Sequence, residues 1–101
     1  MHVDGFDWDL GNLAKIERHG LTRLEIEKFF TGHLYVMPDL GHSASEERFI
    51  AMGRGHLGHP TFVAFAIREV GASRFIRPIS ARLMHKREVM KYESAFAKDE
   101  D

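Results

Sequence analysis

The stretch "RFIRPISARLMHKREVMKYE", residues 74–93, concentrates cationic side chains that could bind phosphate. Its six cations are Arg74, Arg77, Arg82, Lys86, Arg87 and Lys91, against two anions, Glu88 and Glu93. We expect Ser80 to cap a helix, which places Arg82, Lys86 and Arg87 near its free N–H groups, where an anion binds readily. Cations at a helix N-terminus oppose the helix dipole, which favours a binding role. The alternative is a solvated face balanced by the two glutamates.

Two further segments carry groups suited to proton transfer. His19, in "ERHG" at 17–20, has an imidazole that titrates near neutral pH, although histidine is also common where a helix ends. Glu47 and Arg48 lie in "HSASEERF" at 42–49, which also holds His42. A carboxylate beside an imidazole provides a base and an acid. The alternative for Glu47 and Arg48 is a surface ion pair, worth under about 1 kcal/mol.

His56 and His59, in "HLGH", are the remaining candidates for a metal site. The chain has no cysteine, and no third ligand is obvious near these histidines. We therefore interpret "GRGHLGHP" at 53–60 as an exposed, glycine-rich hairpin loop, and we expect neither a metal nor another cofactor.

Length and composition restrict the class of protein. The 101 residues predict a single domain over 1–101, with 94–101 as a frayed acidic tail. Residues 1–50 carry a net charge of −4 and residues 51–101 a net charge of +3, so RNA or DNA binding would depend on a local basic face. Apolar runs are too short to span a membrane, and the acidic "MHVDGFDWD" is no secretory signal. The expected location is the cytoplasm.

Hydrophobic periodicity predicts an α+β fold. The expected order is a strand at 6–9, helices at 10–19 and 22–31, strands at 33–39, 47–54, 61–68 and 74–80, and a helix at 81–97. Short connections make the strands antiparallel. Pro78 predicts a sheet edge or a bulge, because proline cannot donate to the ladder. The expected core residues are Trp8, Leu13, Ile16, Ile26, Phe29, Phe30, Phe49, Val63, Phe65, Ile79, Val89 and Tyr92.

Three segments taken in order resemble the BrnT family of bacterial type II toxins over residues 6–93. They are "FDWDLGNLAKIERHGLT", "HSASEERFIAMGR" and "RFIRPISARLMHKREVMKYE". The matching positions are Trp8, Asp9, Asn12, His19, Gly20, Glu46, Glu47, Arg48, Phe49, Gly53, Arg77, Ile79, Ser80, Ala81, Arg82, Arg87, Tyr92 and Glu93. The resemblance implies a RelE-like fold and a metal-independent endoribonuclease that inhibits translation and growth. It also implies a BrnA-like ribbon-helix-helix antitoxin, through which alone the complex binds operator DNA.

Cleavage of RNA by its own 2′-OH needs a base, an acid and cations, and no outside nucleophile. The candidate catalytic residues are His19, Glu47, Arg77 and Arg82, and the candidate phosphate-binding residues are Arg48, Arg54, Lys86 and Arg87. The competing hypothesis is a non-catalytic module whose basic face binds the antitoxin and which co-regulates the operon with it. In either case we expect two copies of each chain, because the ribbon-helix-helix fold dimerises.

Overall fold

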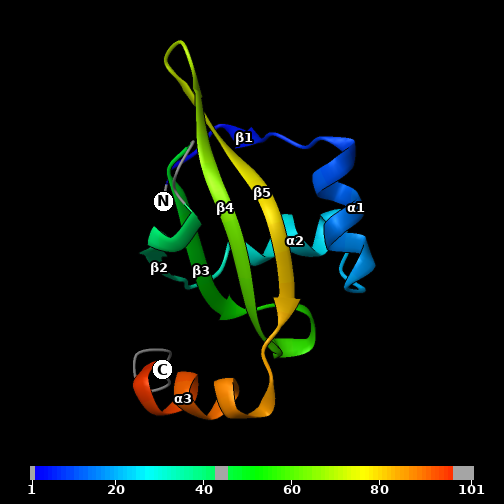
Figure 1. The fold of residues 1–101 in the computed structure, drawn as a ribbon, viewed down its shortest axis with the longest axis vertical. Coiled ribbons are helices and arrows are strands. Elements are labelled where there is room, and N and C mark those ends of the chain that lie inside the picture. The colour runs from blue at the N-terminus through cyan, green and yellow to red at the C-terminus, as the bar shows by residue number, and fades with distance from the viewer. Residues whose placement is uncertain (1, 43–45, 97–101) are drawn as a thin grey trace.

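Five strands and three α-helices form the described part of the chain, residues 2–42 and 46–96 of the computed structural model (Figure 1). The strands are β1 (Gly5–Phe6), β2 (Tyr35–Pro38), β3 (Arg48–Arg54), β4 (Pro60–Val70) and β5 (Ser73–Leu83). The helices are α1 (Leu10–Arg18), α2 (Arg23–Phe29) and α3 (Lys86–Phe96). This arrangement confirms the α+β class and the predicted order of elements. None of the described helices is long and apolar enough to cross a membrane.

The strands form one sheet in the order β1-β5-β4-β3-β2. Neighbours from β2 to β5 are antiparallel, as their short connections predict. The exception is β1, in which Gly5 and Phe6 pair with β5 in parallel. Strands β4 and β5 form a long hairpin that turns at Gly71, whose φ of 61° suits glycine, and extends past its neighbours (Figure 1).

Local capping signals place the first two helices as the sequence predicts. Asp9 caps α1, because its Oδ1 accepts the Asn12 N–H at 2.8 Å. Gly20 follows the helix with a φ of 81°. Thr22 and Glu25 form the capping box that begins α2, with reciprocal hydrogen bonds of 3.1 and 3.0 Å.

The prediction of a final helix capped by Ser80 is wrong. Strand β5 continues to Leu83, with Ser80 opposite Ala64. The hydrogen-bonded pairing with β4 outweighs the local preference of serine for a helix cap. Instead α3 follows His85, whose N–H donates to the Glu88 carboxylate at 2.8 Å. The helix continues to Phe96, through the start of the predicted frayed tail, and residues 97–101 lie outside the described residues.

Pro78 lies at a bulge, as predicted. Phe65 of β4 pairs with Pro78, whereas Ala64 pairs with Ser80, so Ile79 is an extra residue on β5. The register shift matters for the site, because it sets which side chains beyond Pro78 face each side of the sheet.

The two faces of the sheet are covered unequally. Helices α1 and α2 cover one face over a core of Ile16, Leu21, Ile26, Phe29, Ala51, Val63, Phe65, Ile76 and Ala81. On the opposite face α3 packs over one end, where Tyr92 and its neighbours contact Met52 and Met84 (Figure 1). Alternation along β3 places Ile50 and Met52 on the α3 face. No described helix covers the rest of that face.

Most of the predicted core is buried. The buried members are Ile16, Ile26, Phe29, Val63, Phe65, Ile79 and Tyr92. The others are half-buried: Trp8, Leu13, Phe30, Phe49 and Val89.

Candidate active site

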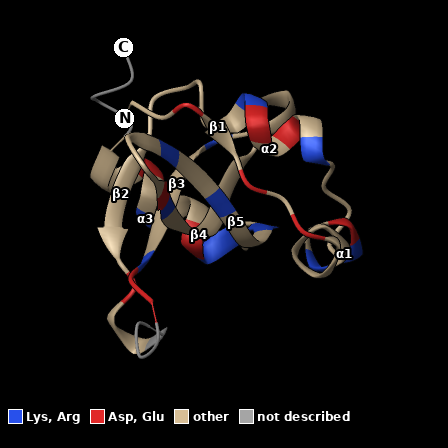
Figure 2. Cartoon of the chain, turned by 90° about the horizontal axis from the view of Figure 1, so that it is seen from above, with Lys and Arg blue, Asp and Glu red and all other residues tan. Residues whose placement is uncertain are grey.

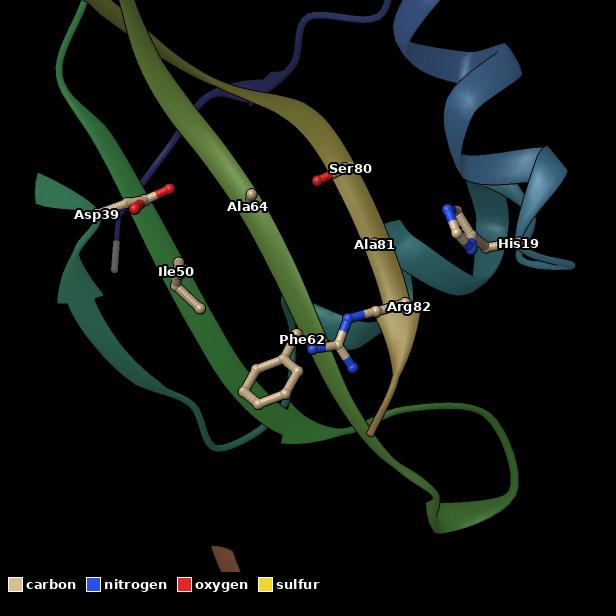
Figure 3. A pocket seen from close by; sticks show the side chains of 8 residues that line it. All are labelled: His19, Asp39, Ile50, Phe62, Ala64, Ser80, Ala81 and Arg82. Carbon is tan, nitrogen blue, oxygen red and sulfur yellow. The ribbon is translucent and has the colours of Figure 1, made fainter. Parts of the chain in front are cut away.

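A pocket of about 300 Å³ opens on the sheet face that α3 leaves partly uncovered (Figure 3). Its lining residues are His19, Asp39, Ile50, Phe62, Ala64, Ser80, Ala81 and Arg82. The register explains how they meet, because Ala64 lies between Ile50 and Ser80 on adjacent strands. His19 extends from the end of α1 toward β5 (Figure 3). The pocket thus combines an apolar floor with an imidazole, a hydroxyl, a carboxylate and a guanidinium.

Arg82 is held firmly at this pocket. Its Nη1 and Nη2 donate to the two oxygens of Glu88 at 2.8 and 2.9 Å. Its guanidinium also lies 4.9 Å from the ring centroid of Phe62, on the pocket floor. The Arg82 bonds and the His85 N–H lower the pKa of Glu88 to about 2. The carboxylate is therefore ionised at neutral pH and fixes the direction of the guanidinium.

Arg77 belongs to a second charged group on the same face. Its guanidinium contacts Asp9 Oδ2 at 3.3 Å and Glu46 Oε2 at 3.6 Å. Glu46 also lies 4.0 Å from Arg48 Nε. Ala66 is opposite both Arg48 and Arg77 in the sheet, so the two arginines flank it. The N–H of Asn12 and then Arg77 lower the pKa of Asp9.

His19 both ends α1 and lines the pocket. Its backbone ends α1, with the N–H donating to the carbonyl of Ile16 at 3.1 Å. Its side chain is exposed and lines the same pocket as Arg82. The backbone role in the helix therefore leaves the imidazole available to the pocket.

Glu46, rather than Glu47, contacts the arginines. Glu47 is exposed immediately before β3, and no ion pair joins it to another described residue. Alternation gives the reason, since residues two apart on an extended chain share a face and Glu46 is two residues before Arg48. The same periodicity was the available signal for choosing between the two glutamates.

The other predicted phosphate-binding residues lie away from this pocket. Arg54, at the end of β3, bonds to the Gly58 carbonyl at 3.2 Å and to Glu93 at 3.5 Å. Lys86 and Arg87 line a shallow groove along the outside of α3. The expectation that Arg82 shares a helix N-terminus with them is wrong, because Arg82 lies on β5.

The basic run in the sequence therefore does not form one basic surface. Figure 2 shows basic and acidic segments interleaved over the chain. His56 pairs with Glu25 at 3.2 Å, outside the pocket. Within residues 2–42 and 46–96, no three histidine or acidic side chains are gathered as metal ligands would be.

Sequence reasoning missed four contributors to the site: Asp39, Phe62, Ser80 and Glu88. Phe62 lies in the predicted strand 61–68, but its partner Arg82 depended on the length of β5. Ser80 was assigned to a helix cap, and Glu88 was interpreted as a charge on a solvated face. Their roles follow from the register and from the true start of α3.

Comparison with known proteins identifies the family. A family model described as the ribonuclease toxin BrnT of type II toxin–antitoxin systems matches residues 8–88. The chain belongs to the BrnT family. Family membership makes it a ribonuclease toxin and implies an antitoxin partner, which confirms the resemblance seen in the sequence. The matched range contains every residue that lines the pocket described above. A search of curated proteins found no match.

Proposed function

We propose that this BrnT-family chain cleaves RNA at the His19–Arg82 pocket, without a metal ion. The RNA 2′-oxygen attacks the adjacent phosphorus as its proton passes to a base. The bond from phosphorus to the 5′-oxygen then breaks, and that oxygen takes up a proton. The products are a 2′,3′-cyclic phosphate and a 5′-hydroxyl. Positioned acid–base groups accelerate such steps about 10²–10⁴-fold, and fixed positive charge contributes further.

The observation that carries this proposal is that His19 and Arg82, 63 positions apart in the sequence, line one pocket. An imidazole transfers a proton near neutral pH. A guanidinium stabilises the additional charge on the phosphorus oxygens in the transition state. Ser80, two residues before Arg82 on β5, also lines the pocket and offers a hydroxyl for positioning the RNA (Figure 3).

Arg77 and Arg48 extend the proposed site along the sheet. Arg77 is paired with Ala66, and Arg82 with Phe62, four residues earlier on β4. At a rise of about 3.3 Å per residue, the Cα atoms of the two arginines lie about 13 Å apart along the same face of the sheet. We assign Arg77 and Arg48 to a neighbouring phosphate of the same RNA strand. Glu46 contacts both arginines, at 3.6 and 4.0 Å, and a proton-transfer role for Glu47 stays a prediction.

The proposed partner is a ribbon-helix-helix antitoxin in a complex of two copies of each chain. Such an antitoxin would cover the pocket, inhibit cleavage and connect the complex to operator DNA. The free toxin would act in the cytoplasm, where RNA cleavage stops translation and growth. Copurification of a tagged chain with the product of its neighbouring gene, followed by light scattering, tests both the partner and the stoichiometry.

The experiment that tests the reaction uses purified chain, excess chelator and a short RNA. We expect cleavage to persist and the 5′ fragment to end in a cyclic phosphate. A single 2′-deoxy substitution at the cleaved nucleotide should abolish the reaction, because the nucleophile is removed. Loss of activity in chelator, restored by a divalent metal, would contradict the proposal.

A second candidate function is antitoxin binding without catalysis. The specific observation that favours it is that Arg77 and Arg82 already contact carboxylates, Glu46 and Glu88, within the chain. Acidic side chains of an antitoxin would use the same chemistry. This candidate predicts tight copurification together with no RNA cleavage by the free chain, and such a pair of results would replace the first proposal.

A further inference from the structure

The guanidinium of Arg82 has two edges, and Glu88 occupies only one of them. Glu88 accepts one N–H from each terminal nitrogen, Nη1 and Nη2, in an end-on arrangement. The Leu83 carbonyl accepts from Nη1 at 3.3 Å. A guanidinium carries five N–H donors in a planar fork. The Nε–H and the remaining Nη2–H, which lie along one side of the fork, have no acceptor among the described residues.

This second edge has the geometry that a phosphate requires. Two parallel N–H groups bind two oxygens of one phosphate, and such paired bonds are stronger and more directional than a single bond. The Arg82 side chain is 40% exposed, and its acceptors among the described residues lie on Nη1 and on one side of Nη2, which leaves this edge available to a ligand. Phe62 lies against the guanidinium and belongs to the pocket floor, which places the edge beside the proposed reaction.

Glu88 is itself held in place from the start of α3. Its Oε1 accepts the His85 N–H at 2.8 Å as well as the Arg82 bond. The carboxylate therefore joins the helix to the guanidinium by three hydrogen bonds in total. A carboxylate anchored in this way restricts the rotamers of the long arginine side chain, which would otherwise sample many directions.

We infer that Glu88 is a positioning residue that holds Arg82 by its end and presents the Nε–Nη2 edge to the scissile phosphate. The inference rests on the proposed function of the pocket. RNA then binds without displacing Glu88, and the pair stays intact during cleavage. In the competing description, Glu88 competes with the phosphate for Arg82. Removal of the Glu88 carboxylate would then free Arg82 for the phosphate and raise kcat.

Glu88→Gln distinguishes the two descriptions by the sign of its effect. Glutamine keeps one acceptor oxygen but cannot accept the two charged hydrogen bonds from Arg82 together. Loss of the negative charge raises the local positive potential, so KM for RNA should stay the same or fall. We expect kcat to fall by up to about 100-fold, because a misplacement of a catalytic group by about 1 Å can slow a reaction by that factor. An unchanged or higher kcat would overturn the inference.

Glu93→Gln is the matched control, because it makes the same charge change on the same helix. Glu93 pairs with Arg54 at 3.5 Å and does not line the pocket. We expect kcat for this variant within about twofold of the parent, since single exposed ion pairs contribute little. An equal fall in kcat in both variants would attribute the effect to net charge and would also overturn the inference.

A measurement on the unmodified chain removes any dependence on variant folding. An RNA with 2′-deoxy nucleotides binds without being cleaved and serves as the probe in an NMR titration. We expect the Arg82 Nε–H signal to move while the Glu88 carboxyl carbon stays unchanged. Movement of the Glu88 signal toward that of a free glutamate would show displacement and refute the inference. Absence of RNA cleavage by the parent would instead refute the proposed function.

Discussion

Two arginine–glutamate pairs connect the sheet to α3, and they differ in geometry and in place. Arg82 grips Glu88 through two bonds of 2.8 and 2.9 Å and lies 4.9 Å from the Phe62 ring centroid. Arg54 contacts Glu93 at 3.5 Å and lies 5.7 Å from the ring centroid of Tyr92. Both arginines combine a glutamate with an aromatic ring, yet only Arg82 lines the pocket with His19.

The comparison teaches that residue types alone do not define this site. Arg54 ends β3 opposite Pro60, where it lines a separate groove with His56. Arg82 lies on the pocket-lining part of β5, before the chain turns into α3. The register of the β4–β5 hairpin therefore decides which of the two similar pairs lies at the pocket.

The largest effect should come from removing the imidazole that shares the pocket with Arg82. We expect His19→Ala to slow RNA cleavage at pH 7 by about 10²–10⁴-fold, the usual contribution of a positioned acid or base. If His19 acts as the base, the loss should shrink at high pH, because hydroxide then removes the 2′-OH proton. His56→Ala, beside Arg54, is the control. Comparable losses in the two variants at pH 7 would contradict the placement of the site.

A smaller effect should separate the shape of the guanidinium from its charge. Lysine at position 82 keeps the charge but lacks the planar fork that binds Glu88 and a phosphate together. We expect Arg82→Lys to retain partial activity, lower by about 10-fold, which corresponds to one charged hydrogen bond. Arg54→Lys should be close to the parent in the same initial-rate assay. Full activity of Arg82→Lys would show that the bidentate geometry is unnecessary.

The smallest effect concerns stability in acid. The pKa of Glu88 is lowered to about 2, so its ionised form stabilises the folded state above the ordinary pKa of 4.5. That stabilisation should be lost progressively as the pH falls from about 4.5 toward 2. Urea unfolding at several pH values should show a weaker acid dependence for Glu88→Gln than for the parent. Glu93→Gln should keep the acid dependence that Glu88 contributes to the free energy of unfolding. Identical dependence on pH in the parent and both variants would disprove that contribution.

The sequence was sufficient for the fold wherever local signals agreed with the final packing. Asp9, Gly20 and the Thr22–Glu25 capping box mark the first two helices, and Pro78 marks the bulge. It was insufficient at Ser80, because a serine before a helical pattern gives no measure of how far β4 will pair with β5. Strand pairing is a long-range property, and it overrides local propensity.

The sequence predicted only some of the residues that line the candidate site. His19 and Arg82 were identified by residue type, and the structure places them together. Arg54, Lys86 and Arg87 have equal charge but lie elsewhere, since their positions depend on the β3 end and the α3 start. The contribution of Glu88 required the distances themselves, because a glutamate near arginines in sequence is usually a solvated charge.

Single-turnover RNA cleavage by Arg82→Ala and Arg54→Ala, measured side by side, tests the central claim most directly. The sequence alone predicts that alanine at position 82 leaves the melting temperature within a few degrees; the Glu88 and Phe62 contacts indicate a larger decrease. Both variants should therefore be assayed well below their melting temperatures. We predict a loss of about 10²–10³-fold for Arg82→Ala and near-parental cleavage for Arg54→Ala. Equal activities of the two folded variants would contradict the assignment of the active site.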